Sequence, residues 1–290
     1  MTLPEFPEFK LIGFEDRKGV SEFIAKYPSE ACEINFGNIF IWRHFDHSKL
    51  TSINGNLCIL CEPPSEPAYF LQPLGENKIQ ETLKTCLSFA PRLSRIPESF
   101  AATYCSGLRG EPDRNNFDYV YLSEDLISLK GKKYDGKRNR IRKFERNHDY
   151  RYLSMSTNHL DDCRLLFEKW LETKASSDRS FLSMWRQVIQ ETFLHFKELG
   201  LTGGVIEMDR RVTAFSMGER LTSDTAVIHI EICDPGCEGL PQLINREFIK
   251  QEWADYRFIN REQDMGIPGL RRAKTSYYPH HLIKKYNIWG

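Results

Sequence analysis

The segment from Leu201 to Gly290 constrains the fold more than any other part of the chain, because its patterns follow one another in a defined order. A predicted hairpin and a β-rich strand over 226–233 lead into a glycine-containing loop, a helix and a further strand. A strand that passes through such a loop into a helix presents backbone N–H groups and the positive end of the helix dipole to an anion. This order therefore predicts a ligand that carries phosphate.

The same order of elements occurs earlier in the chain. The first set has helices over 15–26 and 35–45, a hairpin over 49–61 that turns at Asn54-Gly55, a strand in AYFLQPLG, a helix over 77–89 and a loop over 94–100. The second has helices over 160–173 and 183–199, a hairpin over 203–221 that turns near Asp209-Arg210, the strand 226–233, a helix over 241–253 and a strand over 256–259. We expect an α/β (α+β) protein of two similar domains, 1–130 and 131–290, each a twisted mixed sheet flanked by helices.

Composition excludes several classes of protein. The 290 residues hold 40 basic and 40 acidic side chains, so net charge favours no particular partner. The N-terminus has acids and prolines where a secretory signal needs a basic start and an apolar run. No segment approaches the roughly 18 apolar residues of a membrane-spanning helix. We expect a cytoplasmic protein.

Eight cysteines raise the question of a metal site or disulfides. Cys58 and Cys61 have the C-x-x-C spacing, but they lie in the β-rich run LCILCEP and no second pair follows. Alternation along a strand would send the two thiols to opposite faces. Structural thiols are therefore the favoured interpretation, and a metal-dependent enzyme would need a ligand cluster that this sequence does not display.

A run of basic residues lies between the two predicted domains. Nine Lys or Arg residues stand between Lys130 and Arg146, against only Asp135 and Glu145. Ile141 and Phe144 mark the apolar stripe of a helix that starts near Tyr134. Its basic face is either simply solvated or binds a polyanion in a cleft between the domains. The candidates for phosphate contact are Lys137, Arg138, Arg140 and Arg142.

The loop between the strand 226–233 and the following helix is the candidate donor-binding loop. Gly236 and Gly239 permit close approach of a ligand to the backbone, and the helix begins next to Leu240. An ordinary strand-to-helix turn is the alternative, and Glu238 would repel a phosphate if it pointed inward.

The segment FINREQDMGIPGLRRAKTSYYP, residues 258–279, is the densest in side chains that can carry chemistry. Glu262 or Asp264 can act as a general base, Lys274 can stabilise developing negative charge, and Tyr277 or its neighbour can donate a proton. Arg271 is a further candidate for phosphate contact. The structural alternative is that the carboxylates cap the loop and pair with the arginines, while the tyrosines pack at an edge.

His229 is placed by strand alternation on the same face as Glu231. The couple could polarise an amine, or His229 could be a hydrogen-bonded histidine of the core or sheet edge. No serine nucleophile elbow, Walker loop or dinucleotide-binding loop is present.

The segments INFGNIFIWR, KRNRIRKFERNH and INREQDMGIPGLRRAKTSYYP, spread over 34–279, resemble an uncharacterised bacterial family allied to the C-terminal domain of phosphatidylglycerol lysyltransferase. The order of elements is similar to the GNAT acyltransferase fold, and two copies in tandem resemble the Fem peptidyltransferases, which use aminoacyl-tRNA. The resemblance implies two tandem GNAT-like domains. It also implies a transferase that moves an acyl or aminoacyl group to an amine or hydroxyl of a small-molecule, peptide or lipid acceptor.

The donor that the resemblance implies is aminoacyl-tRNA or acyl-CoA, used as a substrate rather than as a bound cofactor. The pyrophosphate loop of GNAT enzymes opens with Arg or Gln and ends with Gly or Ala, and the segment 233–238 has neither feature. Aminoacyl-tRNA suits the distributed cations better, because a large polyanion interacts with many of them at once. The alternative function is a non-catalytic module that binds an anionic ligand or tRNA in the same cleft.

Overall fold

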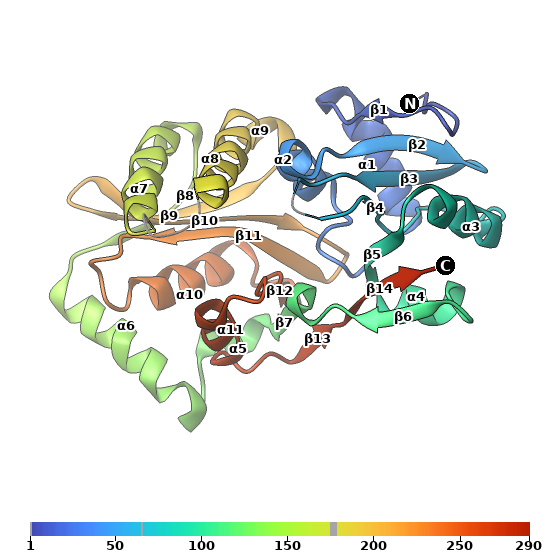
Figure 1. Ribbon diagram of the computed structural model, residues 1–290. Coiled ribbons are helices and arrows are strands. Elements are labelled where there is room, and N and C mark those ends of the chain that lie inside the picture. Colours follow the sequence, from blue (N-terminus) through green and yellow to red (C-terminus); the bar gives the residue numbers. More distant parts are fainter. Residues whose placement is uncertain (1, 65, 175–178) are drawn as a thin grey trace. The chain divides into compact units, whose positions relative to one another are not determined.

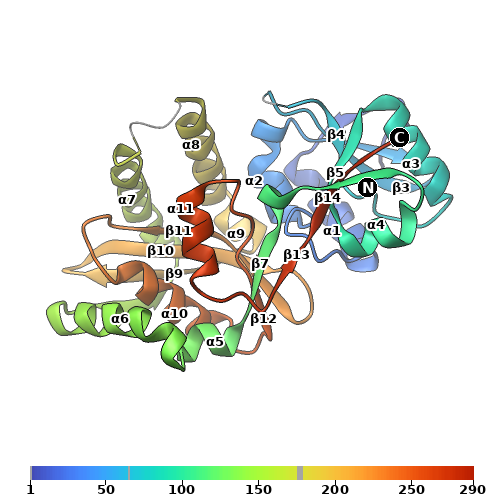
Figure 2. The same cartoon turned by 60° about the horizontal axis from the view of Figure 1, so that its bottom comes forward.

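A computed structural model of the chain describes residues 2–64, 66–174 and 179–290. The chain divides into two compact units, drawn in Figure 1 and Figure 2. Unit 1 comprises Met1–Asp118, Gln263–Arg271 and Leu282–Gly290, and unit 2 comprises Tyr119–Glu262 and Arg272–His281. The sequence predicted a single boundary after residue 130. In the structure each unit instead combines segments that are separated in the sequence.

Unit 1 is built on a mixed sheet with the strand order β1-β2-β3-β4-β5-β14-β6. Its strands are β1 (Lys10–Leu11), β2 (Lys49–Ile53), β3 (Asn56–Cys61), β4 (Tyr69–Phe70), β5 (Arg92–Pro97), β6 (Arg109–Pro112) and β14 (Lys285–Trp289). Its helices are α1 (Arg17–Lys26), α2 (Phe36–Asp46), α3 (Ile79–Phe89) and α4 (Glu98–Tyr104). Strands β4 and β5 run parallel, and every other pair of neighbours in this sheet is antiparallel.

Unit 2 is built on a second mixed sheet, with the order β13-β7-β12-β11-β10-β9-β8. Its strands are β7 (Asp118–Leu122), β8 (Arg151–Ser154), β9 (Thr202–Met208), β10 (Arg211–Arg220), β11 (Thr225–Cys233), β12 (Phe258–Asn260) and β13 (His281–Ile283). The remaining helices are α5 (Ser123–Ser128), α6 (Asp135–Asn147), α7 (Leu160–Glu172), α8 (Arg179–Leu194), α9 (Phe196–Leu199), α10 (Leu240–Glu252) and α11 (Pro268–Thr275). Helices α7 and α8 cover one face of this sheet, and α10 with α6 packed against it covers the other (Figure 1, Figure 2).

The two sheets repeat one arrangement. In each, a hairpin precedes a strand, a helix and a second strand parallel to the first, namely β4, α3 and β5 in unit 1 and β11, α10 and β12 in unit 2. The next strand in each sheet comes from the other half of the sequence, β14 beside β5 and β7 beside β12. The predicted fold class, two mixed sheets each flanked by helices, is confirmed, and the exchange of β7 and β14 explains why no single boundary separates the units.

The predicted hairpin turns are confirmed in detail. Asn54 and Gly55 both have positive φ, as do Asp209 and Arg210, which suits the tight turns that match strand twist. The loop predicted over 94–100 is wrong, since β5 and α4 occupy these residues. Arg95 has φ of 59° in the middle of β5, and this irregularity breaks the alternation by which a strand is recognised. Among the described residues, no helix has the length and apolar character needed to cross a bilayer.

Candidate functional site

Strand β11 carries His229 at a β-bulge. The register of β10 against β11 shifts between Met217 and Gly218, which leaves His229 without a partner residue on β10. A Cβ atom on Gly218 would lie 2.2 Å from the carbonyl oxygen of Val227, so the close approach of the two strands requires glycine there. A bulge of this kind bends the strand and re-aims the side chain.

The imidazole of His229 joins two carboxylates. Its Nδ1 lies 2.7 Å from Glu262 Oε1, and its Nε2 lies 2.9 Å from Glu219 Oε1. Burial alone would lower the pKa of His229, but the hydrogen bonds to Glu219 and Glu262 outweigh burial and raise this pKa to about 10. His229 is therefore an imidazolium at neutral pH that donates from both nitrogens, and it holds the carboxylates rather than shuttling protons.

Of the two interpretations of His229, the structure supports the buried, hydrogen-bonded histidine, because its side chain is 2% exposed and its partners are Glu219 and Glu262 instead of Glu231. Glu231 Oε1 accepts a hydrogen bond from Arg261 Nη2 at 3.2 Å, and its Oε2 accepts from Asn245 Nδ2 at 3.0 Å. The bulge at His229 interrupts the regular alternation on which a couple with Glu231 rested. Glu231 thus pairs with Arg261, while His229 pairs with Glu219 and Glu262, although both residues belong to β11.

These side chains gather where the parallel strands β11 and β12 separate. The paired register runs only from Thr225 and Phe258 to Val227 and Asn260, while β11 continues to Cys233. The two residues that follow β12, Arg261 and Glu262, then contact β11 through side chains instead of backbone bonds. In open α/β sheets ligands bind outside the carboxyl ends of parallel strands, so this is the candidate site of unit 2.

Glu262 occupies an unusual backbone conformation at this point. Its φ is 54°, its amide donates to Asn260 Oδ1 at 2.7 Å, and its carbonyl accepts from the Tyr119 amide at 3.1 Å. The Asn260 side chain that receives this amide is fully buried. Left-handed residues other than glycine cost about 1–3 kcal/mol and concentrate at functional sites. The surrounding bonds hold Glu262 in this conformation.

Lys274 and Tyr277, the other predicted catalytic residues of unit 2, both contact Arg261. Lys274 Nζ donates to the Arg261 carbonyl oxygen, and the Arg261 guanidinium lies 4.9 Å from the centre of the Tyr277 ring. Burial raises the pKa of the Tyr277 phenol above its usual range. Sequence reasoning missed Arg261 as the centre of this group, since a charged residue at a strand end gives no sign of being buried.

Lys137 lies inside the same group and not on the exposed basic surface where its helix pattern had placed it. Its Nζ donates to Ser276 Oγ at 2.7 Å and stands 3.6 Å from the centre of the Tyr277 ring. Burial, followed by repulsion from Arg261 and Arg140, lowers the pKa of Lys137 to about 8.

Asp264 and Arg271 belong to unit 1, whereas Arg261 belongs to unit 2. Asp264 is fully buried, and its Oδ2 lies 2.8 Å from Arg271 Nε and 3.1 Å from Arg114 Nη1. Its Oδ1 accepts the Gly266 amide at 2.9 Å. This is the structural arrangement named above as the alternative, in which the carboxylate caps the loop and pairs with arginines.

The loop that contains Gly236, Gly239 and Leu240 uses its amides internally. The Gly236 amide donates to Asp234 Oδ1 at 3.0 Å, and the Leu240 amide donates to the Cys237 carbonyl at 3.4 Å. Gly239 has φ of 94°, and a Cβ atom there would lie 2.5 Å from the carbonyl oxygen of Arg140 on α6. These contacts favour the ordinary strand-to-helix turn over a phosphate cradle.

The basic residues of α6 have different surroundings. Arg138 donates to the carbonyl oxygens of Leu129 and Gly131, so it anchors the start of the helix. Arg140 and Lys143 both lie within 4.0 Å of Glu238, at 3.9 Å and 2.7 Å. Arg142 is exposed without a side-chain partner among the described residues, and with Asn139, Glu145 and Arg146 it lines an open recess of about 410 Å³.

Unit 1 contains a buried ion cluster of its own. Lys285 Nζ lies 2.6 Å from Glu33 Oε2 and 2.6 Å from Asp118 Oδ1, and 3.6 Å from the Cys32 sulfur. Burial alone would lower the pKa of Lys285, but Asp118, Cys32 and Glu33 together raise it. Burial raises the pKa of the Glu33 carboxyl. The ammonium is thus completely enclosed by its acidic partners.

Cys32, Glu33 and Asp118 form a possible metal-ligand group by distance, because their ligand atoms lie within 4.8 Å of one another. The Lys285 ammonium contacts all three, so a metal ion would have to displace it. The C-x-x-C pair is divided between different neighbours, since Cys58 contacts Cys86 and Cys61 lies 3.9 Å from Ser48. These two thiols do not form one chelating site.

Replacing His229 with Gln is expected to destabilise the protein most at low pH. The contribution of the imidazolium is complete below the unfolded pKa of about 6.5 and is lost as pH rises through the folded value of about 10. Urea unfolding of the parent and the variant, near pH 6 and near pH 10.5, measures the difference. A difference that stays constant over this range would contradict the assignment of an ion pair.

Replacing Lys285 with Met is expected to lower the free energy of unfolding by about 3–5 kcal/mol, because two buried carboxylates lose their counter-ion. Lys284→Met is the matched control. That neighbouring side chain is 51% exposed and pairs with Glu98 at 3.0 Å, so its loss should change stability by about 0–1 kcal/mol. Equal effects of the two substitutions in urea unfolding would refute the buried cluster.

Solved structures share this fold over the whole chain. A conserved protein of unknown function from Bacteroides thetaiotaomicron VPI-5482 is 27% identical, with a TM-score of 0.88 over 100% of both chains. L-PGS from Bacillus licheniformis is 17% identical, with a TM-score of 0.67 over 100% of this chain and 94% of that one. FemX is 8% identical, with a TM-score of 0.58 over 97% of this chain and 96% of the other. The expected likeness to the Fem fold is confirmed.

No curated protein sequence matches this chain. The family model described as phosphatidylglycerol lysyltransferase, C-terminal, matches residues 24–289. This match spans nearly the whole chain, including His229, Arg261 and Glu262. The chain belongs to the family of phosphatidylglycerol lysyltransferase C-terminal domains.

Proposed function

We propose that this protein transfers an acyl or aminoacyl group from a phosphate-bearing donor to an amine or hydroxyl acceptor. Membership of a family described as a lysyltransferase domain and the likeness to L-PGS and FemX support an acyltransferase. The observation that carries the proposal is Glu262, fixed with positive φ at the carboxyl ends of two parallel strands by an imidazolium behind it. Such a constrained carboxylate is suited to accept a proton.

The reaction assigns a distinct task to each residue. The acceptor N–H or O–H gives its proton to Glu262 as the acceptor atom bonds to the carbonyl carbon of the donor. Negative charge develops on the carbonyl oxygen, and we assign its stabilisation to the cations Arg261 and Lys137, which both contact the Tyr277 ring. The bond from the carbonyl carbon to the donor oxygen then breaks, and that oxygen takes the proton from Glu262. His229 stays protonated throughout and acts as a positioning residue.

Aminoacyl-tRNA is the donor we favour over acyl-CoA. The amides of Gly236 and Leu240, which a pyrophosphate would need, already donate within their own loop. Arg142 and Arg146 instead project from the exposed face of α6, where a long polyanion can reach several cations at once. With aminoacyl-tRNA as donor, the RNA would contact the exposed face of α6 and the aminoacyl ester would lie at Glu262.

Glu262→Gln is expected to lower kcat/KM by about 100-fold or more, the usual effect of removing a general base. The assay incubates the protein with labelled aminoacyl-tRNAs and acyl-CoAs and a panel of amine and hydroxyl acceptors. Glu219→Gln is the matched control, because it weakens the other hydrogen bond to His229 at similar cost in stability. Equal losses of turnover in the two variants would show that Glu262 only positions His229. Tight binding of every donor without transfer would favour a non-catalytic module.

Replacing Arg142 and Arg146 together with Glu is expected to weaken tRNA binding and to flatten its salt dependence. The slope of log K against log salt should fall by about 2, close to one for each lost phosphate contact. Lys84→Glu on α3 is the control, since it changes an exposed helical cation in unit 1. An unchanged slope in the double variant would exclude α6 as the phosphate-binding surface.

A further inference from the structure

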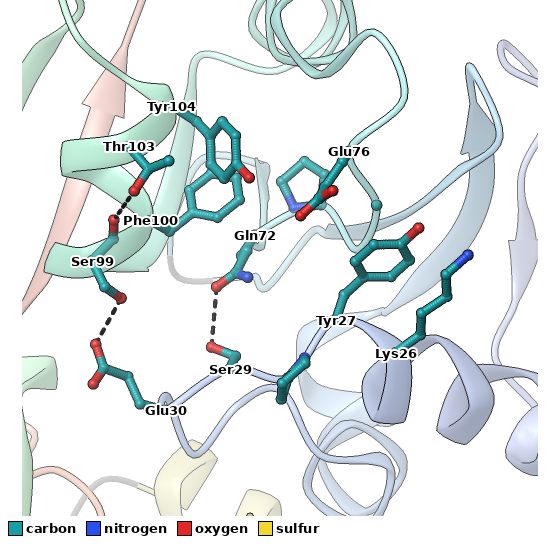
Figure 3. Close-up of a pocket in the computed structure, with 13 residues that line it drawn as sticks. Lys26, Tyr27, Ser29, Glu30, Gln72, Glu76, Ser99, Phe100, Thr103 and Tyr104 are labelled. Atoms are coloured by element: carbon teal, nitrogen blue, oxygen red, sulfur yellow. Dashed lines mark hydrogen bonds between the residues drawn. The ribbon is translucent and has the colours of Figure 1, made fainter.

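Unit 1 contains a pocket of about 430 Å³ at the carboxyl ends of its own parallel strands. Gln72 follows β4, while Phe100 and Tyr104 belong to α4, which follows β5 directly. Tyr27, after α1, lies across the pocket from them, whereas Glu30 lies beside α4 and its Oε1 accepts from Ser99 Oγ at 2.8 Å (Figure 3). Within its sheet this pocket has the position that ligands take in open α/β sheets, yet none of its residues belongs to the group around Arg261.

The floor of the pocket presents an amide donor without a partner. Gln72 is only 8% exposed, and its Oε1 accepts a hydrogen bond from Ser29 Oγ at 3.0 Å. The Ser29 oxygen accepts a hydrogen bond from the Ala31 backbone amide, and the Ser29 hydroxyl proton is donated to Gln72 Oε1. This bond fixes which end of the Gln72 carboxamide is oxygen and which is nitrogen. Within the described residues nothing accepts from the Gln72 nitrogen. The Gln72 amide lines the cavity, where its nitrogen can donate to an acceptor oxygen of a ligand.

The walls combine aromatic rings with acidic groups. Phe100 and Tyr104 lie 4.9 Å apart between ring centres, and Tyr27 faces them across the cavity (Figure 3). Glu30 and Glu76 supply two carboxylates, against one cation, Lys26, among the described residues that line the pocket. Aromatic faces together with carboxylates are the usual environment for an ammonium group.

We propose that this pocket binds a small molecule that joins a protonated amine to a carbonyl oxygen. The oxygen accepts from the Gln72 amide at the floor. The ammonium lies between the rings and contacts the carboxylates of Glu30 and Glu76. The volume lies within the range of about 300–1,000 Å³ typical of small-molecule sites. This inference is independent of the transfer reaction proposed for unit 2, because it concerns binding alone.

Three probes separate the two halves of the ligand in titrations followed by ligand-observed NMR. Glycinamide carries both an ammonium and a carbonyl group, acetamide carries only the carbonyl, and ethylammonium carries only the ammonium. The unmodified protein should bind glycinamide about 10-fold more tightly than either partial probe, since a charge-assisted hydrogen bond contributes about 1.5–3 kcal/mol. No saturable binding of glycinamide, or equal affinity for all three probes, would overturn the proposal.

Substitutions locate the binding. Glu30→Gln combined with Glu76→Gln should weaken glycinamide and ethylammonium about 10-fold and leave acetamide unchanged. Gln72→Met should weaken glycinamide and acetamide but not ethylammonium. Glu22→Gln is the matched control, because Glu22 is exposed on α1 and does not line this pocket. Unaltered glycinamide affinity in the double variant would place the binding elsewhere and refute the site.

Discussion

The buried imidazolium of His229 is the interaction on which unit 2 depends most. It joins the end of β10 through Glu219, the bulge of β11 and the segment after β12 through Glu262. Where β11 and β12 separate, no backbone bonds remain to hold the strands at a fixed spacing. The His229 side chain replaces those bonds. Its hydrogen bonds to Glu219 and Glu262 connect β10, β11 and the residues after β12 where the strands separate.

Buried charge pairs recur in the described parts of both units. Lys285 is enclosed by Glu33 and Asp118, and Asp264 by Arg114 and Arg271. Such pairs contribute less to stability than apolar packing would, because both charges lose their water, but breaking one is strongly destabilising. They join the segments 263–271 and 282–290 to Glu33, Arg114 and Asp118 of unit 1. The three clusters therefore specify the path of the chain more than they stabilise it.

The parts of the fold that depend on local sequence could be predicted, and those that depend on tertiary contacts could not. Asn54-Gly55 defines its hairpin through backbone preference alone, and Ile141 and Phe144 define the buried stripe of α6. The bulge at His229 arises from the pairing of β11 with β10, and strand alternation therefore gave no sign that Glu219 and Glu262 are the partners of this histidine.

The same limit applies to the candidate site. Glu262, Lys274 and Tyr277 could be chosen by residue type, because few other groups can exchange protons or carry charge in that segment. The surroundings of Lys274 and Tyr277 depend on Arg261, and those of Glu262 depend on His229, which are tertiary contacts that no local pattern predicts. Asp264 pairs with arginines of unit 1 while Glu262 pairs with His229 of unit 2, and no local pattern in the sequence distinguishes the two.

The exchange of β7 and β14 has a consequence for how the protein is made. During synthesis β7 emerges before its neighbour β12, while β5 must wait until residues 285–289 have left the ribosome. The sheet of unit 1 therefore cannot gain β14 beside β5 until the residues of unit 2 have been translated, and this edge of β5 stays without β14 until then. Contacts between residues so distant in sequence slow folding, so the β5–β14 pair is a slow step in completing the sheet of unit 1.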